Sequence, residues 1–257
     1  MKTSTSSLWT ADASPTALGR QVKTSERVAS AILELIIERE LQAGDRLPNE
    51  AEMIEHFDVG RGSLREALRI LETFGLIVLR SGPGGGPVLL RVNPRDVSRS
   101  FSLYLNLGGA TLEELAEARL LLEPLVARKA AESLTPESAE QIRRVLDREA
   151  GDGVEPSIIV ERANDFHYTL ALSTGNTVLN LLATALKEMY TSRLVNIGLA
   201  EKTTDSTIRH EHAAIGEAVI AGDADLAERL AREHFRTHFE QIKAASPGFV
   251  ASRITWA

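Results

Sequence analysis

Three arginines recur at every fourth residue in one short stretch of the chain, and arginine is a side chain well suited to binding DNA. They are Arg61, Arg65 and Arg69, with Ser63 between the first two. On a helix this spacing gathers the arginines on one face and leaves leucines on the opposite face. The guanidinium group pairs bidentately with phosphate oxygens and with guanine, and a serine hydroxyl can contact phosphate. Arginines spaced by four are more often a plain solvated face, so the neighbouring segments decide between the two interpretations.

Those neighbouring segments are typical of a winged helix-turn-helix. Asn49 precedes Glu52 at capping-box spacing, so a short helix can begin there, and Gly75 stands where a left-handed residue ends the longer helix. Two β-type runs, LIVLR and PVLLR, then flank SGPGGGP, whose glycines allow a tight hairpin. We therefore expect the arginine face to bind DNA, followed in the chain by a hairpin wing.

Three histidines in the second half of the chain are candidate metal ligands. His167, His212 and His234 lie on three different predicted helices, each among apolar residues. Neutral imidazole is the commonest ligand for Zn, Ni, Fe or Mn, and the interior of a helix bundle is a natural metal site. A single helical histidine is more often structural, and the sequence alone does not show that the three converge. The other histidines are expected to face solvent, His210 and His238 because of their offsets from the candidate ligands, and His56 on the short helix.

The elements that position these residues form two domains. From Val97 onward apolar residues recur at helical spacing with no alternating strand pattern, which predicts a bundle of six or seven helices. The predicted fold class is mostly α, an N-terminal winged helix-turn-helix followed by an all-helical bundle. The expected boundaries are a flexible arm at residues 1–23, the winged domain at 24–91, a linker at 92–96, the helical effector-binding and dimerisation domain at 97–245 and a tail at 246–257.

Composition narrows the class of protein. The net charge of -7 over 257 residues argues against a protein that coats nucleic acid, which needs a broad basic surface, but not against a specific operator binder. The chain has no cysteine, which excludes disulfides and thiolate metal sites. No run reaches the ~20 apolar residues of a membrane span, and the N-terminus lacks the apolar core of a signal peptide. We expect a cytoplasmic protein that binds no membrane.

Four pieces follow one another in the first domain: SERVASAILELIIERE, LQAGDRLPNEAEM, VGRGSLREALRILETFGLI and the glycine wing. In this order they resemble the DNA-binding domain of the GntR family of bacterial transcription regulators. The resemblance implies that Arg61 and Arg65 contact DNA in the major groove and that the wing near Ser81 and Gly82 approaches the minor groove. Family members usually carry Ser or Thr where this chain has Gly60, and many carry arginine where it has Ala51. We therefore expect the operator sequence of this protein to differ from the sequences that those family members bind.

The second domain also carries a set of characteristic segments: EARLLLEPLVARKAA, FHYTLALSTGN and EHAAIGEAVIAGDADLAERLAREH. They resemble the all-helical effector-binding domain, called FCD, of the FadR-type branch of the GntR family. For metal-binding members this implies that His167, His212 and His234 hold a divalent cation, Zn, Ni, Fe or Mn, as cofactor. It further implies that a small organic acid binds there, with Arg119 pairing its carboxylate and Asn176 among the effector-binding residues.

One departure leaves two alternatives open for this site. Metal-binding relatives carry an aspartate four residues before the first histidine, where this chain has Ala163, and Asp165 falls nearly opposite on the helix. Three histidines still suffice for zinc with an open position for ligand. The same loss is compatible with a metal-free pocket for an acyl-type ligand.

The predicted function is that of a ligand-responsive transcription regulator rather than an enzyme. We expect a homodimer that binds a pseudo-palindromic double-stranded DNA operator, because one recognition helix reads only a few base pairs. The expected effector is a small carboxylate-type metabolite. The enzymatic alternative is a metal-dependent hydrolase that uses the three histidines, but the chain has no HExxH-type helix to supply a general base. A third alternative makes the helical domain a scaffold for dimerisation only.

Overall fold

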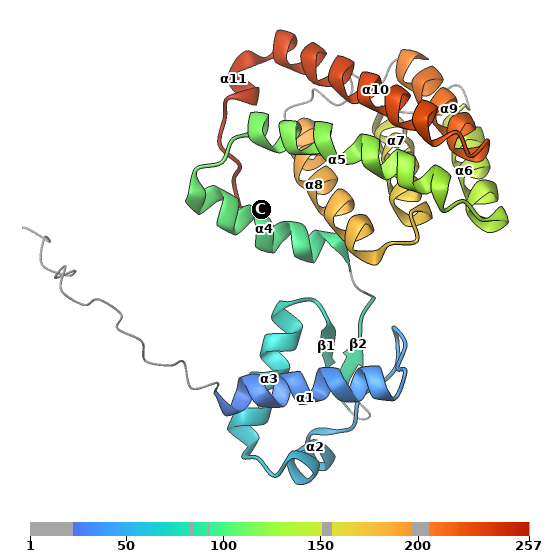
Figure 1. Ribbon diagram of the computed structural model, residues 1–257. Coiled ribbons are helices and arrows are strands. Elements are labelled where there is room, and N and C mark those ends of the chain that lie inside the picture. Colours follow the sequence, from blue (N-terminus) through green and yellow to red (C-terminus); the bar gives the residue numbers. More distant parts are fainter. Residues whose placement is uncertain (1–22, 83–84, 92, 151–155, 197–205, 257) are drawn as a thin grey trace, which may run out of the picture. The chain divides into compact units, whose positions relative to one another are not determined.

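The computed structural model describes residues 23–82, 85–91, 93–150, 156–196 and 206–256 (Figure 1). Side chains at 94–95, 156–164, 195–196 and 206 lie outside the description. The chain divides into two compact units, Met1–Val92 and Asn93–Ala257. The arm expected at residues 1–23 lies outside the described residues except for Lys23. The fold is mostly helical, with the winged helix-turn-helix first and the helical domain second, as the sequence predicts.

The described part of the N-terminal unit contains three helices and a two-stranded antiparallel sheet. In the sheet Ile77 pairs with Leu89 and Arg80 pairs with Gly86. This order of helix, helix, helix and hairpin is the winged arrangement that the sequence predicts. The elements are α1 (Thr24–Glu38), α2 (Glu50–Phe57), α3 (Arg61–Thr73), β1 (Ile77–Arg80) and β2 (Gly86–Leu89).

Local signals begin and end the helices of this unit where the sequence predicts. The Asn49 side chain accepts hydrogen bonds from the amides of Ala51 and Glu52, and the Glu52 side chain accepts from the Asn49 amide, so the capping box is complete. Gly60 precedes α3 without a side-chain cap. Gly75, with φ of 68°, turns the chain out of α3, a conformation that glycine adopts at little cost.

The core of the N-terminal unit lies on the leucine face of α3. Leu64, Leu68 and Leu71 are each at most 2% exposed and pack against α1, α2 and β1. The buried partners are Val28 and Ile32 of α1, Met53 of α2 and Ile77 of β1. Burial of this face fixes the rotation of α3 about its axis, so the arginine face must point outward.

The C-terminal unit is all-helical in the part that the structure describes. Its seven longer helices agree with the predicted bundle of six or seven, and none of these described helices combines the length and apolarity that crossing a bilayer requires. The elements are α4 (Pro94–Gly108), α5 (Leu112–Glu132), α6 (Pro136–Glu149), α7 (Pro156–Ser173), α8 (Thr177–Asn196), α9 (Ser206–Ile220), α10 (Ala224–Ala245) and the short α11 (Pro247–Val250).

Helix α5 is the centre of this unit, with α10 alongside it and α7, α8 and α9 also packed against it (Figure 1). Two apolar clusters share the interior. One joins α5, α6, α7, α8, α9 and α10, and the other joins α5, α8, α10 and the C-terminal residues. Phe166 of the first cluster directly precedes His167, and its ring stacks on that of His212.

The ends of the helical unit differ in detail from the expected boundaries. Helix α4 already begins at Pro94, so three of the five residues expected to form a linker are helical, and proline suits the first turn of a helix. The segment expected as a tail folds back onto the unit. The Ile254 amide donates to the Ala110 carbonyl, the Leu112 amide donates to the Ser252 carbonyl, and Ile254 is 2% exposed.

Candidate DNA-binding surface and histidine cluster

The arginine face of α3 is open to solvent. Arg61, Arg65 and Arg69 are all exposed, and Ser63 is partly buried. Arg65 Nε lies 3.2 Å from Glu50 Oε2 at the start of α2, and its side chain remains 60% exposed. Such a surface ion pair is weak, at roughly 0.2–1 kcal/mol. The guanidinium groups are therefore available to phosphate and base edges.

The wing depends on its glycines. Gly82 has φ of +95°, and the Gly85 amide donates to the Gly82 carbonyl at 2.8 Å. A Cβ at Gly85 would lie 2.3 Å from the Arg80 carbonyl oxygen, so no other residue fits this turn. The Leu79 amide donates to Glu72 Oε1 at 3.0 Å, which ties the wing to α3. Ser81 and Gly82 are exposed at the described part of the wing tip.

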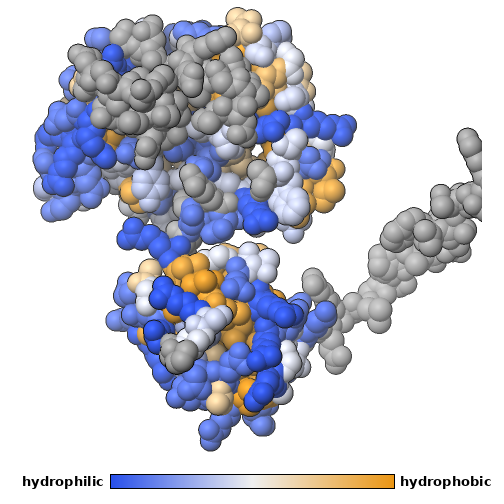
Figure 2. All heavy atoms as spheres, turned by 180° about the vertical axis from the view of Figure 1, so that it is seen from behind, coloured by the Kyte–Doolittle hydropathy of each residue, from blue (hydrophilic) through white to orange (hydrophobic). Residues whose placement is uncertain are grey.

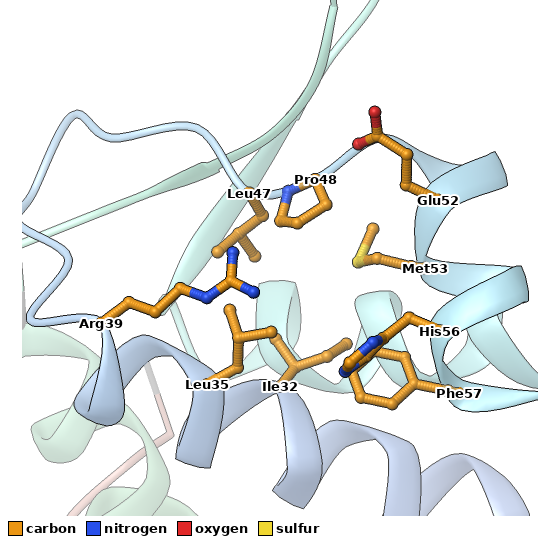
Figure 3. Close-up of a pocket in the computed structure, with 9 residues that line it drawn as sticks. All are labelled: Ile32, Leu35, Arg39, Leu47, Pro48, Glu52, Met53, His56 and Phe57. Carbon is orange, nitrogen blue, oxygen red and sulfur yellow. The ribbon is translucent and has the colours of Figure 1, made fainter.

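A small pocket lies between α1 and α2 (Figure 3). It has a volume of about 250 Å³, and its lining includes Arg39, Glu52 and His56 around apolar side chains. His56 is exposed, as expected, and its ring packs edge-on against Phe57. The α3 arginines do not line this pocket.

In the space-filling view, hydrophobic side chains gather in the middle of the visible face of the N-terminal unit, with hydrophilic ones around them (Figure 2).

In the helical unit, the structure brings together the three histidines that the sequence analysis singled out. One ring nitrogen from each of His167 on α7, His212 on α9 and His234 on α10 lies within 4.8 Å of the other two. His212 is 1% exposed and His234 is 4% exposed. The Phe166 ring stacks on His212 with centroids 4.3 Å apart, so the cluster has an aromatic wall.

Two carboxylates from different helices orient the histidine rings. Glu149 Oε1, at the end of α6, lies 2.7 Å from His212 Nδ1, and Glu211 Oε2 lies 2.7 Å from His234 Nδ1. A neutral imidazole that donates from Nδ1 keeps the lone pair of its Nε2 free. The Nε2 atoms of His212 and His234 face each other at 3.3 Å. Carboxylates that fix ring orientation in this way accompany metal-ligating histidines in many proteins.

Burial controls the protonation of the cluster. It lowers the pKa of His167 and of His212 well below 6.5, with the neighbouring histidines adding to the effect. It raises the pKa of Glu149 to about 7, against opposing effects of His234 and Arg209. At neutral pH the His167 and His212 rings are therefore neutral, the state in which imidazole binds a metal.

Arg119 lies on α5 beside the cluster and is 7% exposed. Its Nε and Nη2 donate to Glu123 Oε1 at 2.9 and 2.8 Å. The guanidinium also lies 5.0 Å from the centroid of the Tyr190 ring and 5.2 Å from that of Phe235, whose ring neighbours His167 at 5.1 Å. Lys187 of α8 is buried nearby, and burial lowers its pKa to about 8. The site thus combines three histidines with buried cations.

The structure shows the surroundings of two further residues named in the sequence analysis. Asn176, expected to bind effector, is exposed, and its Oδ1 accepts from the amides of Val178 and Leu179, which makes it the cap of α8. The prediction that His238 faces solvent is wrong. Its buried Nδ1 has no partner among the described residues, and its ring stacks on His234 with centroids 6.3 Å apart. Residues four apart share a helix face, so the offset from His234 already contained this signal.

The remaining expectations concern residues that precede His167 or His212 in the sequence. His210 is exposed, as expected. Asp165 Oδ2 lies 3.3 Å from Arg148 Nη1, so this carboxylate is engaged outside the cluster. Ala163 lies within α7, but its side chain is outside the described residues, as are those of Glu161 and Asn164.

Sequence reasoning missed the two carboxylates, the buried Lys187 and the inward His238. Glu211 directly precedes His212 but serves His234 on another helix, and Glu149 is 63 residues from His212. No local pattern marks either pairing. Only the helical offset of His238 was visible in the sequence.

Comparison with known proteins gives matches along most of the chain. Residues 24–85 match the family described as bacterial regulatory proteins, gntR family, and residues 114–237 match the FCD domain. The HTH-type transcriptional repressor NanR of Cronobacter sakazakii (strain ATCC BAA-894) is 29% identical over 247 residues, covering 91% of this chain and 93% of its own. NanR of Enterobacter sp. (strain 638) is 27% identical over 223 residues, 84% of each chain. The solved structure of Streptococcus agalactiae GntR has a TM-score of 0.63 and 27% identity, and the match covers 83% of this chain and 98% of that chain.

Proposed function

Since this chain belongs to the GntR family, as a DNA-binding transcription regulator with an FCD effector domain and not an enzyme, we propose what it binds and how it responds. It binds a pseudo-palindromic operator as a homodimer, and a small carboxylate in the helical unit changes its affinity for DNA. Because the relatives are named transcriptional repressors, we propose that it represses. The matched families are regulators, which sets the hydrolase alternative aside.

The residues of the histidine cluster fit a divalent metal ion. Two nitrogens bound to one tetrahedral zinc at 2.0–2.1 Å lie about 3.3 Å apart, which is the separation of the Nε2 atoms of His212 and His234. His167 supplies the third nitrogen. Two lone pairs facing each other at this distance repel unless a proton or a cation lies between them. This spacing is the observation that carries the proposed metal site.

Bound metal would supply a Lewis-acid position open to a ligand oxygen. The protein's own groups then decide which ligand binds. The Arg119 guanidinium already uses Nε and Nη2 on Glu123, and its remaining N–H groups can donate to a carboxylate. Glu123 holds that guanidinium in place, and the rings of Tyr190 and Phe235 exclude water around it. We propose Arg119 and Lys187 as the cations that select an anionic effector.

We propose that the DNA contacts come from Arg61, Ser63, Arg65 and Arg69, and from the wing at Ser81 and Gly82. Support comes from the exposure of the α3 arginines and from the glycine-dependent wing turn. Dimer formation doubles the few base pairs that one helix reads. The helical unit offers apolar surface for a second copy, because Leu121 and Leu125 of α5 are 69% and 49% exposed one turn apart.

The decisive experiment measures metal and effector in the full-length protein. Elemental analysis of protein purified without chelator or metal-affinity resin should find about one zinc-class ion per chain, and thermal shifts should then rank organic acids. Equal, near-zero metal in the parent and in the triple variant His167→Ala, His212→Ala, His234→Ala would contradict the metal site. A carboxylate response that survives in such metal-free protein but vanishes in Arg119→Gln would place the effector in a metal-free pocket. Sedimentation of the full chain tests the dimer, and a monomer at operator-binding concentrations contradicts it.

A further inference from the structure

A second cavity lies in the helical unit, away from the residues of the histidine cluster. It has a volume of about 370 Å³ and lies between α4, α8 and the C-terminal residues Ile254 and Thr255. None of His167, His212, His234 or Arg119 lines it. Cavities of this size hold small metabolites.

The arginine on the α8 wall of this cavity has an unused donor. Arg193 Nη1 donates to Thr255 Oγ1 at 2.7 Å, whereas its buried Nε has no hydrogen-bond partner among the described residues. An unmade hydrogen bond at a buried donor costs about 1–3 kcal/mol. The Nε edge of a guanidinium is one of the two edges that pair with a carboxylate. A ligand oxyanion that reaches this edge from the cavity would supply the acceptor that Arg193 Nε lacks.

The C-terminal residues hold both arginines of the cavity. Thr255 binds Arg193, and the guanidinium of Arg99 on α4 lies over the Trp256 ring at 5.5 Å from its centroid. The Ile254 backbone is itself fixed, because its amide donates to Ala110 and its carbonyl accepts from the Asn106 side chain at 2.6 Å. Fixed cations bind an anion at a smaller entropic cost than mobile ones. This explains how a short terminal segment can contribute to a binding site.

The charges around the cavity define the ligand. Asp96 and Glu188 line it together with Arg99 and Arg193, so the lining carries no net formal charge. Two carboxylates in the lining disfavour a doubly charged anion such as a phosphate. They also offer acceptors to a hydroxyl or ammonium group on the ligand.

We propose that this cavity is a second ligand site, for a small monocarboxylate that also carries a hydroxyl or ammonium group. Hydroxy acids and amino acids belong to this class. The ligand carboxylate pairs with Arg193 and Arg99, and its second polar group lies against Asp96 and Glu188. The site is distinct from the proposed effector site at Arg119.

Trp256 provides a direct reporter of this site. The chain has two tryptophans, so the full-length Trp9→Phe variant leaves Trp256 as the single indole. It is titrated with glycine, L-serine, L-lactate and D-glycerate up to about 20 mM, above the millimolar range of weak specific ligands. At least one of the four should change Trp256 emission saturably, because an anion that binds Arg99 alters its contact with the ring. No saturable change with any of them overturns the proposal.

Variants assign the signal to the cavity. Arg193→Lys keeps the charge but removes the Nε donor, and should weaken binding tenfold or more. Arg236→Lys, on the exposed face of α10, is the matched control and should bind as the parent does. Parent-like binding by Arg193→Lys overturns the proposal.

Two further measurements test the site if Arg193→Lys does not fold, and test the proposed class of ligand. If circular dichroism shows that Arg193→Lys is unfolded, Ser192→Leu replaces it, since Ser192 lines the cavity and a larger side chain fills it. Unchanged binding by Ser192→Leu contradicts the site. Inorganic phosphate, titrated in parallel, should bind more weakly than the best monocarboxylate. Tighter binding of phosphate would reject the proposed ligand class.

Discussion

The Nε2 atoms of His212 and His234 lie 3.3 Å apart, and a carboxylate 2.7 Å from each Nδ1 holds each ring in this position. The two carboxylates come from α6 and α9. Together with the histidines on α7, α9 and α10, they make one centre to which four helices contribute. Carboxylates in such positions commonly orient metal-ligating histidines. The first predictions test this relationship.

Replacing His234 by Ala should weaken metal binding by an order of magnitude or more. Each histidine supplies a coordination bond that water replaces poorly. The measurement is competition with a chromophoric chelator. His210→Ala is the control, because His210 is exposed on the same helix as His212. Equal affinities of the two variants would show that the cluster holds no metal.

Replacing Glu211 by Gln should weaken metal binding by about 10- to 100-fold without abolishing it. The amide can still accept from His234 Nδ1, but a neutral oxygen makes a weaker hydrogen bond than the carboxylate does. The same chelator competition measures the effect. Glu217→Gln, at an exposed position of the same helix, should match the parent. Metal affinity unaffected by Glu211→Gln would mean that the 2.7 Å contact only packs the ring.

The metal-free protein should lose stability in mild acid, in part through His238. Burial lowers the pKa of His238 to about 3, whereas the unfolded side chain titrates near 6.5. Between these values the unfolded chain binds more protons, so the free energy of unfolding falls as pH falls below about 6.5, by up to about 1.4 kcal/mol per pH unit for one proton. Glu149 opposes this, because its raised pKa makes the folded state bind more protons up to about pH 7.

Urea unfolding of chelator-treated protein between pH 5 and 7 measures that dependence. His238→Asn removes a group whose pKa is lowered by burial. It should therefore weaken the dependence of the free energy of unfolding on pH, whereas His210→Asn should not. An identical slope in His238→Asn and in the parent would contradict the burial of this imidazole.

Replacing Arg65 by Ala should cost about 1–3 kcal/mol of operator binding if the side chain reads a base. Loss of its exposed ion pair with Glu50 should leave the fold stable. Fluorescence anisotropy at one fixed salt concentration measures the affinity, and Arg61→Ala should behave similarly. Arg143→Ala, on an exposed face of the helical unit, is the control. Parent-like affinity of both α3 variants would mean that another surface recognises the operator.

Replacing Gly85 by Ala should reduce operator affinity several-fold, because the new Cβ would lie 2.3 Å from the Arg80 carbonyl and the wing must change its conformation. Anisotropy measures the loss, and elemental analysis should show unchanged metal in the helical unit. Gly108→Ala, where no neighbouring heavy atom lies within 4 Å, should bind the operator normally. An unaltered affinity in Gly85→Ala would remove the wing from the interface.

The sequence by itself determined the elements of the winged domain. The capping box at Asn49, the left-handed Gly75 and the leucine face of α3 are local features. Caps and helical periodicity act within about one or two turns, so a linear pattern records them. The same periodicity predicted the helices that carry the three histidines. It also places His238 on the face of His234, so the expectation that His238 faces solvent misread its offset.

Only the tertiary structure decided what surrounds each of these histidines. Glu149 meets His212 across 63 residues, and Glu211 serves a histidine on the next helix rather than its own neighbour. It also folded the C-terminal residues onto the Arg193 cavity. The rotation of one helix against another depends on how whole apolar faces interlock. That information is distributed over many residues, and no single motif in the sequence carries it.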